Sequence, residues 1–158
     1  MMFEDYLSEL KSEKLEDRHA AVDRIAALAS SDLEKYVPEI VSLLKKSDTD
    51  TRWYLGRALI KLGKDVIPCL IKESEMETDM AVQKYFASIL AYFGEDAAEP
   101  LVKLFESENA TSRGMAAAAL EKIGDGSVIY LMEAVQSDNK TVSVCAGIVL
   151  AKLGVYDY

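Results

Sequence analysis

The stretch RGMAAAALEKIG, residues 113–124, carries the pattern that decides the fold. It begins with Arg113, places Leu120 and Ile123 three residues apart, and ends at Gly124. Apolar residues at this spacing lie on one face of a helix. Glycine commonly ends a helix, because it accepts the left-handed backbone conformation found there. The stretch therefore predicts an amphipathic helix that stops at Gly124.

The same pattern recurs along the chain every 30 or 31 residues. The glycines that close the copies are Gly63, Gly94, Gly124 and Gly154. We call the place eleven residues before each glycine the register position, and it is occupied by Arg52, Gln83, Arg113 and Ser143. Arg18 marks a fifth copy, in which Ala29 takes the place of the closing glycine. A period of this length indicates a repeat architecture. It predicts five copies, approximately residues 3–30, 31–64, 65–95, 96–125 and 126–155, in a single domain covering residues 1–158.

Each copy divides into two helical segments with a polar break between them. Pro68 and Pro100 fit the first turn of a helix, where the missing N–H has no helical partner. The place of Pro38 stays open, because residues 33–37 could already be helical and the proline would then kink the helix. The segment from Ser31 to Glu34 matches a capping box, and Asp125-Gly126 is expected to be a turn between helices. A pair of helices this short cannot bury its apolar faces alone, so the pairs must stack into an all-α solenoid.

Residues 17–28 and 113–124 resemble HEAT repeats, closest to the short variety also found in phycobilisome lyases. The resemblance extends over nearly the whole chain, from about residue 3 to residue 155. It implies a right-handed α-α superhelix of about five helix pairs whose second helices line a concave surface. It also implies a protein-binding scaffold rather than an enzyme.

Composition excludes several other functions. The 27 acidic and 18 basic residues give a net charge of -9, which disfavours a nucleic-acid binder. One histidine, His19, and two cysteines, Cys69 and Cys145, are too few for a His-rich or Cys-rich metal site, and we expect no cofactor. The cysteines lie two copies apart, so we expect reduced thiols. No apolar stretch is long enough to span a membrane, and no secretory signal pattern opens the chain, so we expect a cytoplasmic protein.

The second helices of copies two and three carry the candidate binding surface. Positions one, five and nine after the register position share one side of a helix. Residues 51–62 contain three bases and no acid. Aromatic residues and arginine often anchor interfaces, so we predict a concave strip that binds an acidic peptide or helix of another protein. The residues of this strip are Trp53, Tyr54, Arg57, Lys61, Lys84, Tyr85 and Tyr92. Packing of these aromatic residues between repeats is the alternative.

The last copy is unusual because residues 141–151 contain no charge, although a terminal repeat usually has a polar outer face. Val144 and Ile148 occupy the places of Trp53 and Arg57 and predict a surface for self-association, giving a homodimer. The tail, residues 155–158, offers the competing explanation of a lid over this surface.

An enzymatic role stays open as the alternative function. A lyase-like or glycosylase-like HEAT protein, or its accessory subunit, would use the same groove, but no catalytic nucleophile is evident. A deep pocket with a strongly perturbed carboxylate beside Trp53 and Tyr85 would favour catalysis, whereas a broad open groove would favour protein binding.

Overall fold

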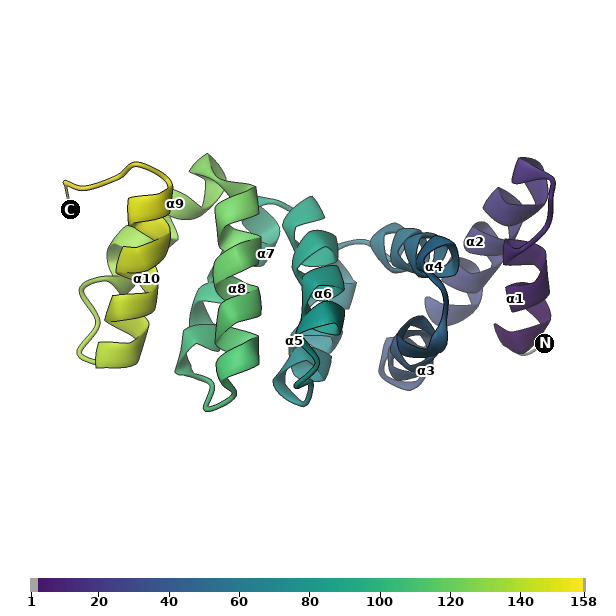
Figure 1. Ribbon diagram of the computed structural model, residues 1–158, viewed down its shortest axis with the longest axis horizontal. Helices are drawn as coiled ribbons and strands as arrows, with labels where there is room; N and C mark the ends of the chain where they lie inside the picture. The colour runs from purple at the N-terminus through teal and green to yellow at the C-terminus, as the bar shows by residue number, and fades with distance from the viewer. Residues whose placement is uncertain (1–2, 158) are drawn as a thin grey trace. The chain divides into compact units, whose positions relative to one another are not determined.

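The protein is described by a computed structural model of residues 3–157, apart from the side chain of Glu4. The described residues form helices and contain no strand (Figure 1). The helices are α1 (Phe3–Leu10), α2 (Leu15–Ala29), α3 (Leu33–Lys46), α4 (Thr49–Lys61), η1 (Lys64–Val66), α5 (Ile67–Glu75), α6 (Met80–Tyr92), α7 (Glu95–Lys103), η2 (Leu104–Glu106), α8 (Ala110–Ile123), α9 (Asp125–Ala134) and α10 (Lys140–Lys152), where η marks a 3-10 helix. None of those helices is long and apolar enough to cross a membrane.

These helices form five consecutive pairs, as the repeat pattern predicts. The second helix of each pair is α2, α4, α6, α8 or α10, and the register position lies on it. The first helix is α1, α3, α5, α7 or α9, with η1 leading into α5 and η2 following α7. The predicted all-α class, built of consecutive helix pairs, is therefore confirmed.

The chain divides into two compact units, residues 1–69 and residues 70–158. In the first unit, α2 packs against α1, α3 and α4. In the second unit, α8 packs against α6, α7 and α10, and α9 packs against α7 and α10. Figure 1 shows α6, α8 and α10 side by side in the second unit. The prediction of one domain stays a prediction.

A stripe of large aliphatic residues on the second helices forms the core. These residues stand seven places after the register position and are almost completely buried: Ile25, Leu59, Leu90, Leu120 and Leu150. Full burial of such a side chain contributes about 1.5–3 kcal/mol. The helical period in the sequence therefore identifies the core correctly.

The register residues hold the carboxyl end of the first helix in their own copy. The Nε of Arg52 donates to the carbonyl of Leu44 (2.9 Å), and its Nη2 donates to the carbonyl of Lys45 (3.0 Å). Ser143 Oγ donates to the carbonyl of Val135 at 2.8 Å. Carbonyls at a helix end lack intrahelical partners. Arg52 and Ser143 therefore have the same role in their copies, because each donates hydrogen bonds to these carbonyls.

Residues four places before the register position begin the second helices. Asp48, Asp79, Asn109 and Asn139 are N-caps whose side chains accept a backbone N–H of the first turn. Such caps typically contribute about 1 kcal/mol. In the first copy, Lys14 takes this place and makes no side-chain cap.

The four closing glycines have the predicted positive φ, between 59° at Gly94 and 79° at Gly154. Pro38, whose place the sequence left open, lies inside α3, because the helix already begins at Leu33. The prediction for Pro100 is wrong, because α7 begins at Glu95 and places this proline inside the helix.

Two other local predictions are also wrong. Asp32, not Ser31, caps α3, because its carboxylate accepts the N–H of Lys35, whereas Ser31 Oγ donates to the carbonyl of Leu28. The expected turn at Asp125-Gly126 is the first turn of α9, which follows Gly124 directly.

Candidate functional site

The solvent-exposed side of the second helices is the candidate site. Positions one, five and nine after the register position are exposed from α4 to α10, with only Arg57 half-buried. We call these residues the second-helix face. Its residues are Trp53, Arg57 and Lys61 in the first unit, and Lys84, Ser88, Tyr92, Gly114, Ala118, Lys122, Val144, Ile148 and Lys152 in the second.

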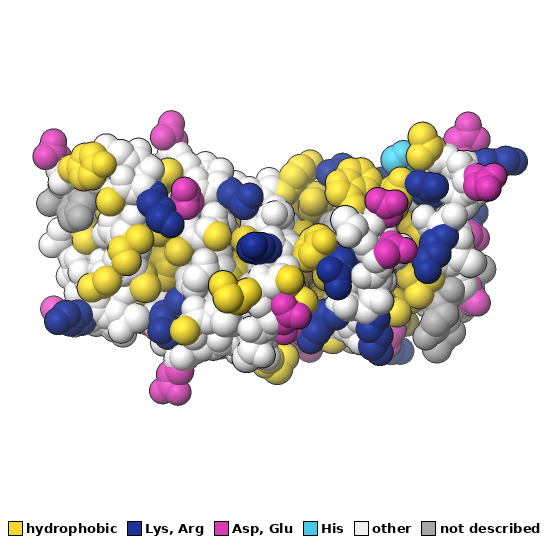
Figure 2. Space-filling view, viewed as in Figure 1, with side chains coloured by type: hydrophobic (Ala, Val, Ile, Leu, Met, Phe, Trp, Pro, Cys, Tyr) yellow, Lys and Arg dark blue, Asp and Glu magenta, His cyan; other side chains and the backbone are white. Residues whose placement is uncertain are grey.

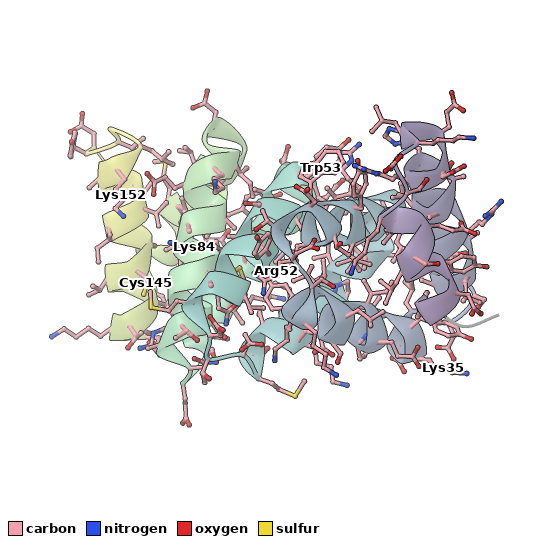
Figure 3. All side chains as sticks on the ribbon, turned by 45° about the vertical axis from the view of Figure 1, so that its right-hand side comes forward. Lys35, Arg52, Trp53, Lys84, Cys145 and Lys152 are labelled. Atoms are coloured by element: carbon pink, nitrogen blue, oxygen red, sulfur yellow. The ribbon has the colours of Figure 1, made fainter. Side chains whose placement is uncertain are left out.

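In the first unit, Trp53 is the most prominent member of this face. It is 56% exposed and projects from α4 (Figure 3). The Cζ of Arg57 lies 5.7 Å from its ring centroid, which is a cation–π distance. Lys61 pairs with Asp23 of α2. An exposed indole held beside a guanidinium has the composition of an interface anchor.

Tyr54 requires a correction, because only 8% of it is exposed. Its ring packs edge-on against Trp53 at 5.0 Å, and Arg18 Nη1 donates to its hydroxyl at 3.4 Å. Tyr54 therefore supports Trp53 from within the core and is not an accessible part of the strip.

In the second unit, the predicted strip residues lie along α6. Lys84 is exposed and Tyr92 is 61% exposed, while Tyr85 is half-buried. Figure 3 shows Lys84 on α6, and Cys145 and Lys152 on α10. Their role in partner binding stays a prediction.

Val144 and Ile148 are 50% and 51% exposed and lie on the same register positions as Lys84 and Ser88. They therefore belong to the second-helix face. Of the tail proposed as a lid, Tyr156 is 74% exposed and Tyr158 lies outside the described residues.

In the second unit, the second helices are mostly basic and the first helices are mostly acidic. The second helices α6, α8 and α10 carry five bases and one acid, Glu121. The first helices α5, α7 and α9, together with η2, carry two bases and eight acids. Figure 2 shows the Lys and Arg side chains among hydrophobic ones over α6, α8 and α10. The protein is acidic overall, yet this face is basic and apolar.

A groove of about 370 Å³ lies between α6 and α8. Its lining residues are Met80, Gln83, Lys84, Ala87, Ala110, Thr111, Gly114, Met115 and Ala118. The positions that carry Trp53 and Arg57 in α4 carry Gly114 and Ala118 here. The groove is open because these residues are small. Sequence reasoning missed it, although glycine at an exposed helix position was the available signal.

Beside this groove, Gln83 joins a polar network at the end of α5. Its Nε2 donates to the carbonyls of Ser74 and Glu77, both at 2.9 Å. Because both partners are carbonyl oxygens, which only accept hydrogen bonds, the atom that faces them must be the amide nitrogen of Gln83. The Oε1 of Gln83 is buried and has no hydrogen-bond partner among the described residues.

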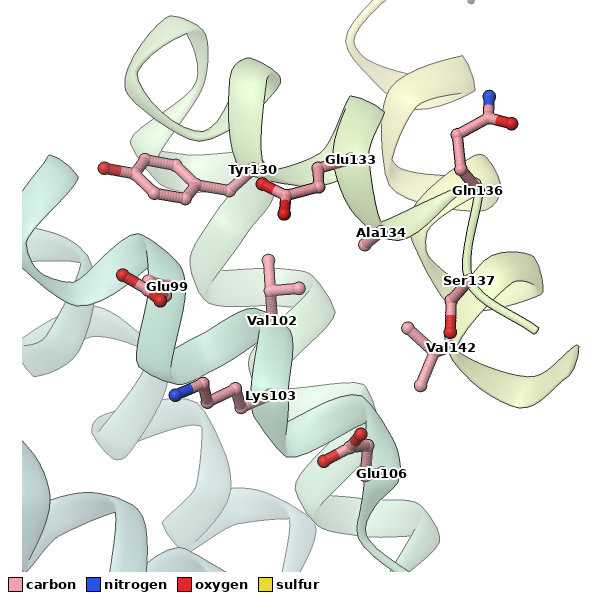
Figure 4. A pocket seen from close by; sticks show the side chains of 10 residues that line it. All are labelled: Glu99, Val102, Lys103, Glu106, Tyr130, Glu133, Ala134, Gln136, Ser137 and Val142. Carbon is pink, nitrogen blue, oxygen red and sulfur yellow. The ribbon is translucent and has the colours of Figure 1, made fainter. Parts of the chain in front are cut away.

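A second hollow, of about 480 Å³, lies on the opposite set of helices, between α7 and α9 (Figure 4). Its lining includes Glu99, Glu106 and Glu133, with Lys103 as the basic residue. Burial and the neighbouring Glu95 carboxylate raise the pKa of the Tyr130 hydroxyl. This acidic hollow contrasts with the apolar groove on the second-helix face.

The residues with catalytic potential are scattered. Among residues 3–157, no three His, Cys, Asp or Glu side chains gather as a metal site would require. Cys69 and Cys145 are not joined in a disulfide, which agrees with the prediction of reduced thiols. Burial raises the pKa of the Cys145 thiol, although Arg113 opposes the shift, so Cys145 lacks the lowered pKa of a reactive cysteine. Neither hollow is lined by Trp53 or Tyr85, where a catalytic pocket was to be sought.

Comparison with known proteins agrees with the fold. The family model described as HEAT repeats matches residues 67–146, from α5 into α10, which is just over half of the chain. The comparison of the chain with curated proteins found no match. HEAT repeats commonly serve as scaffolds for protein interactions. The protein belongs to the HEAT-repeat family.

Proposed function

We propose that the protein is a non-enzymatic cytoplasmic scaffold whose second-helix face binds an acidic segment of another protein. The separation of charge in the second unit carries this proposal. The second unit contains seven basic and fourteen acidic residues, yet five of the seven basic residues lie on α6, α8 and α10. Within the family, we assign it to the short type also found in phycobilisome lyases.

Electrostatics and apolar contact have different tasks in such an interface. An exposed ion pair contributes only about 0.2–1 kcal/mol. Lysines such as Lys84 and Lys122 therefore orient and select an acidic partner, and raise its rate of association. Exposed apolar residues, Trp53 in the first unit and Ile148 in the second, supply the area that provides most of the affinity.

Charge reversal tests the proposal. The variant Lys84→Glu/Lys122→Glu replaces two positive charges on the second-helix face by two negative ones, which changes the net charge by four units. The variant Lys72→Glu/Lys103→Glu makes the same change on the first helices, where both lysines are also exposed. Affinity capture from a lysate, quantified by mass spectrometry, should show acidic proteins that the wild type and the first-helix variant retain and the second-helix variant loses. Equal capture by both variants would refute the proposal.

A parallel variant tests the first unit. Trp53→Ala/Arg57→Ala removes an exposed indole and the half-buried guanidinium beside it. It should lower capture without unfolding the protein, which circular dichroism checks. If capture is unchanged, the binding surface lies elsewhere.

Self-association through Val144 and Ile148 is the other use of this face that we propose to test. The variant Ile148→Glu should convert a homodimer to a monomer in sedimentation experiments. A wild type that sediments as a monomer would leave these residues to a different partner.

A further inference from the structure

We infer that the groove between α6 and α8 is a pocket for one large apolar side chain of the acidic segment. This inference rests on the proposed function and adds the chemistry of the anchor residue. It assigns the groove's specificity to Gly114, which neither the repeat pattern nor the family match addresses.

The shape of the groove follows from the small residues at Gly114 and Ala118. Trp53, Lys84 and Val144 occupy the place of Gly114 in other copies, so the repeat accepts large side chains there. A Cβ built on Gly114 meets no atom within 4 Å. The space above Gly114 is therefore open, and a side chain at this position would occupy it.

The lining suits an apolar guest. Met80 is 69% exposed at the groove, and Met115, only 3% exposed, lies on the other helix. Methionine adapts to guests of different shape because its side chain is flexible and polarizable. An exposed methionine beside a preformed hollow gains contact area when a leucine or aromatic side chain enters.

Charge next to the groove identifies the segment that carries this guest. Lys84 lines the groove, and Lys122 lies on the same exposed side of α8 as Gly114. The single acid on α6, α8 and α10 is Glu121, whose Oε2 lies 3.8 Å from the Nζ of Lys152. Lys84 and Lys122 therefore make the surface beside the groove basic, and this surface complements carboxylates. The occupant is therefore an acidic amphipathic segment with one large apolar residue between its acids.

A randomised 14-residue peptide library displayed on phage is the probe. Peptides are selected on the whole wild-type protein, then synthesised, and their dissociation constants are measured by fluorescence anisotropy. The test variant is Gly114→Leu, which fills the groove. Leucine also favours a helix over glycine by roughly 0.8 kcal/mol, so this variant stays folded. The matched control is Ser42→Leu, which adds the same group to an exposed helical position on α3, outside both the groove lining and the second-helix face.

The expected peptides are acidic and contain one large apolar residue. Gly114→Leu should weaken their binding by about 10- to 100-fold, the range that burial of one apolar side chain supplies, and Ser42→Leu by less than about threefold. Replacing the peptide's apolar residue by alanine should weaken binding to the wild type by a similar factor. The same replacement should have almost no effect on Gly114→Leu, since interacting groups are not additive.

Other results overturn the inference in distinguishable ways. Acidic peptides that bind Gly114→Leu as tightly as the wild type would refute the pocket and leave the proposed function standing. Selected peptides without excess acid, insensitive to Lys84→Glu/Lys122→Glu, would refute both. A wild-type dimer that Gly114→Leu converts to a monomer in sedimentation would identify a second copy of the chain as the occupant.

Discussion

Asn109 and Asn139 stand at the same place in successive copies, yet their replacement by aspartate should have different effects. Both side chains cap a second helix through Oδ1, and aspartate already performs this task at Asp48. Only Asn109 also uses its amide. Its Nδ2 donates to the carbonyl of Glu75 at 3.0 Å and to that of Glu77 at 2.8 Å, both in the preceding copy.

The expected magnitudes follow from these bonds. Asn109→Asp keeps the cap but loses two donated hydrogen bonds, each contributing about 0.5–1.5 kcal/mol. It also places a carboxylate beside two carbonyl oxygens and near Glu77, which is 8% exposed. We expect the free energy of unfolding to fall by about 2–4 kcal/mol. Asn139→Asp should raise it by about 0.3–1 kcal/mol, because a negative charge at a helix N-terminus is favourable.

Urea unfolding at pH 7, followed by circular dichroism, measures both values. The two variants change the same atoms at the same register and have the same net charge, so their difference isolates the bonds between copies. Equal effects of the two substitutions would show that the Asn109 amide contributes nothing to stability. An unchanged dependence on urea concentration in both variants confirms that the same amount of structure unfolds.

Three further results are expected. Gly124→Ala should destabilise the protein by about 1–2 kcal/mol because φ is 70° at Gly124, whereas Gly114→Ala should stabilise it by roughly 0.5–1 kcal/mol; thermal unfolding distinguishes them. Hydrogen bonds from Thr51 lower the pKa of Asp48 below 3.8, so the stability advantage of the wild type over Asp48→Asn should be present above that pH and disappear as the pH falls through the lowered pKa. Because burial raises the pKa of Cys145, its alkylation by iodoacetamide should be slower at pH 8 than that of a free thiol in a peptide, and should still accelerate above pH 9.0.

Periodic features of the fold could be predicted from the sequence. Leu59 and Leu120 are buried at equivalent positions, and Gly63 and Gly124 close equivalent helices. Such features recur because each copy satisfies the same requirement, a buried stripe and a left-handed helix end. Repetition multiplies a signal that would be weak in a single helix.

Features specific to one copy could not be predicted as well. The repeat pattern located Arg52 but gave no reason for arginine there, because its partners are backbone carbonyls that have no sequence signature. Tyr54 was expected at the surface, although it lies only one residue beyond the exposed Trp53. One residue turns a helix by about 100°, which is enough to move a side chain from the face into the core.

The polar network and the groove share the same pair of helices, and this connects stability with binding. Thr111 Oγ1 donates to the carbonyl of Glu77 at 2.7 Å, so α8 is attached to the end of α5 next to Gln83 of α6. Both Gln83 and Thr111 line the groove. A groove whose walls are held by buried hydrogen bonds is formed before a ligand arrives, and a preformed site loses less conformational entropy on binding. Loosening the network through Asn109→Asp should therefore weaken groove binding although Asn109 is not part of the lining, whereas Asn139→Asp should leave it unchanged.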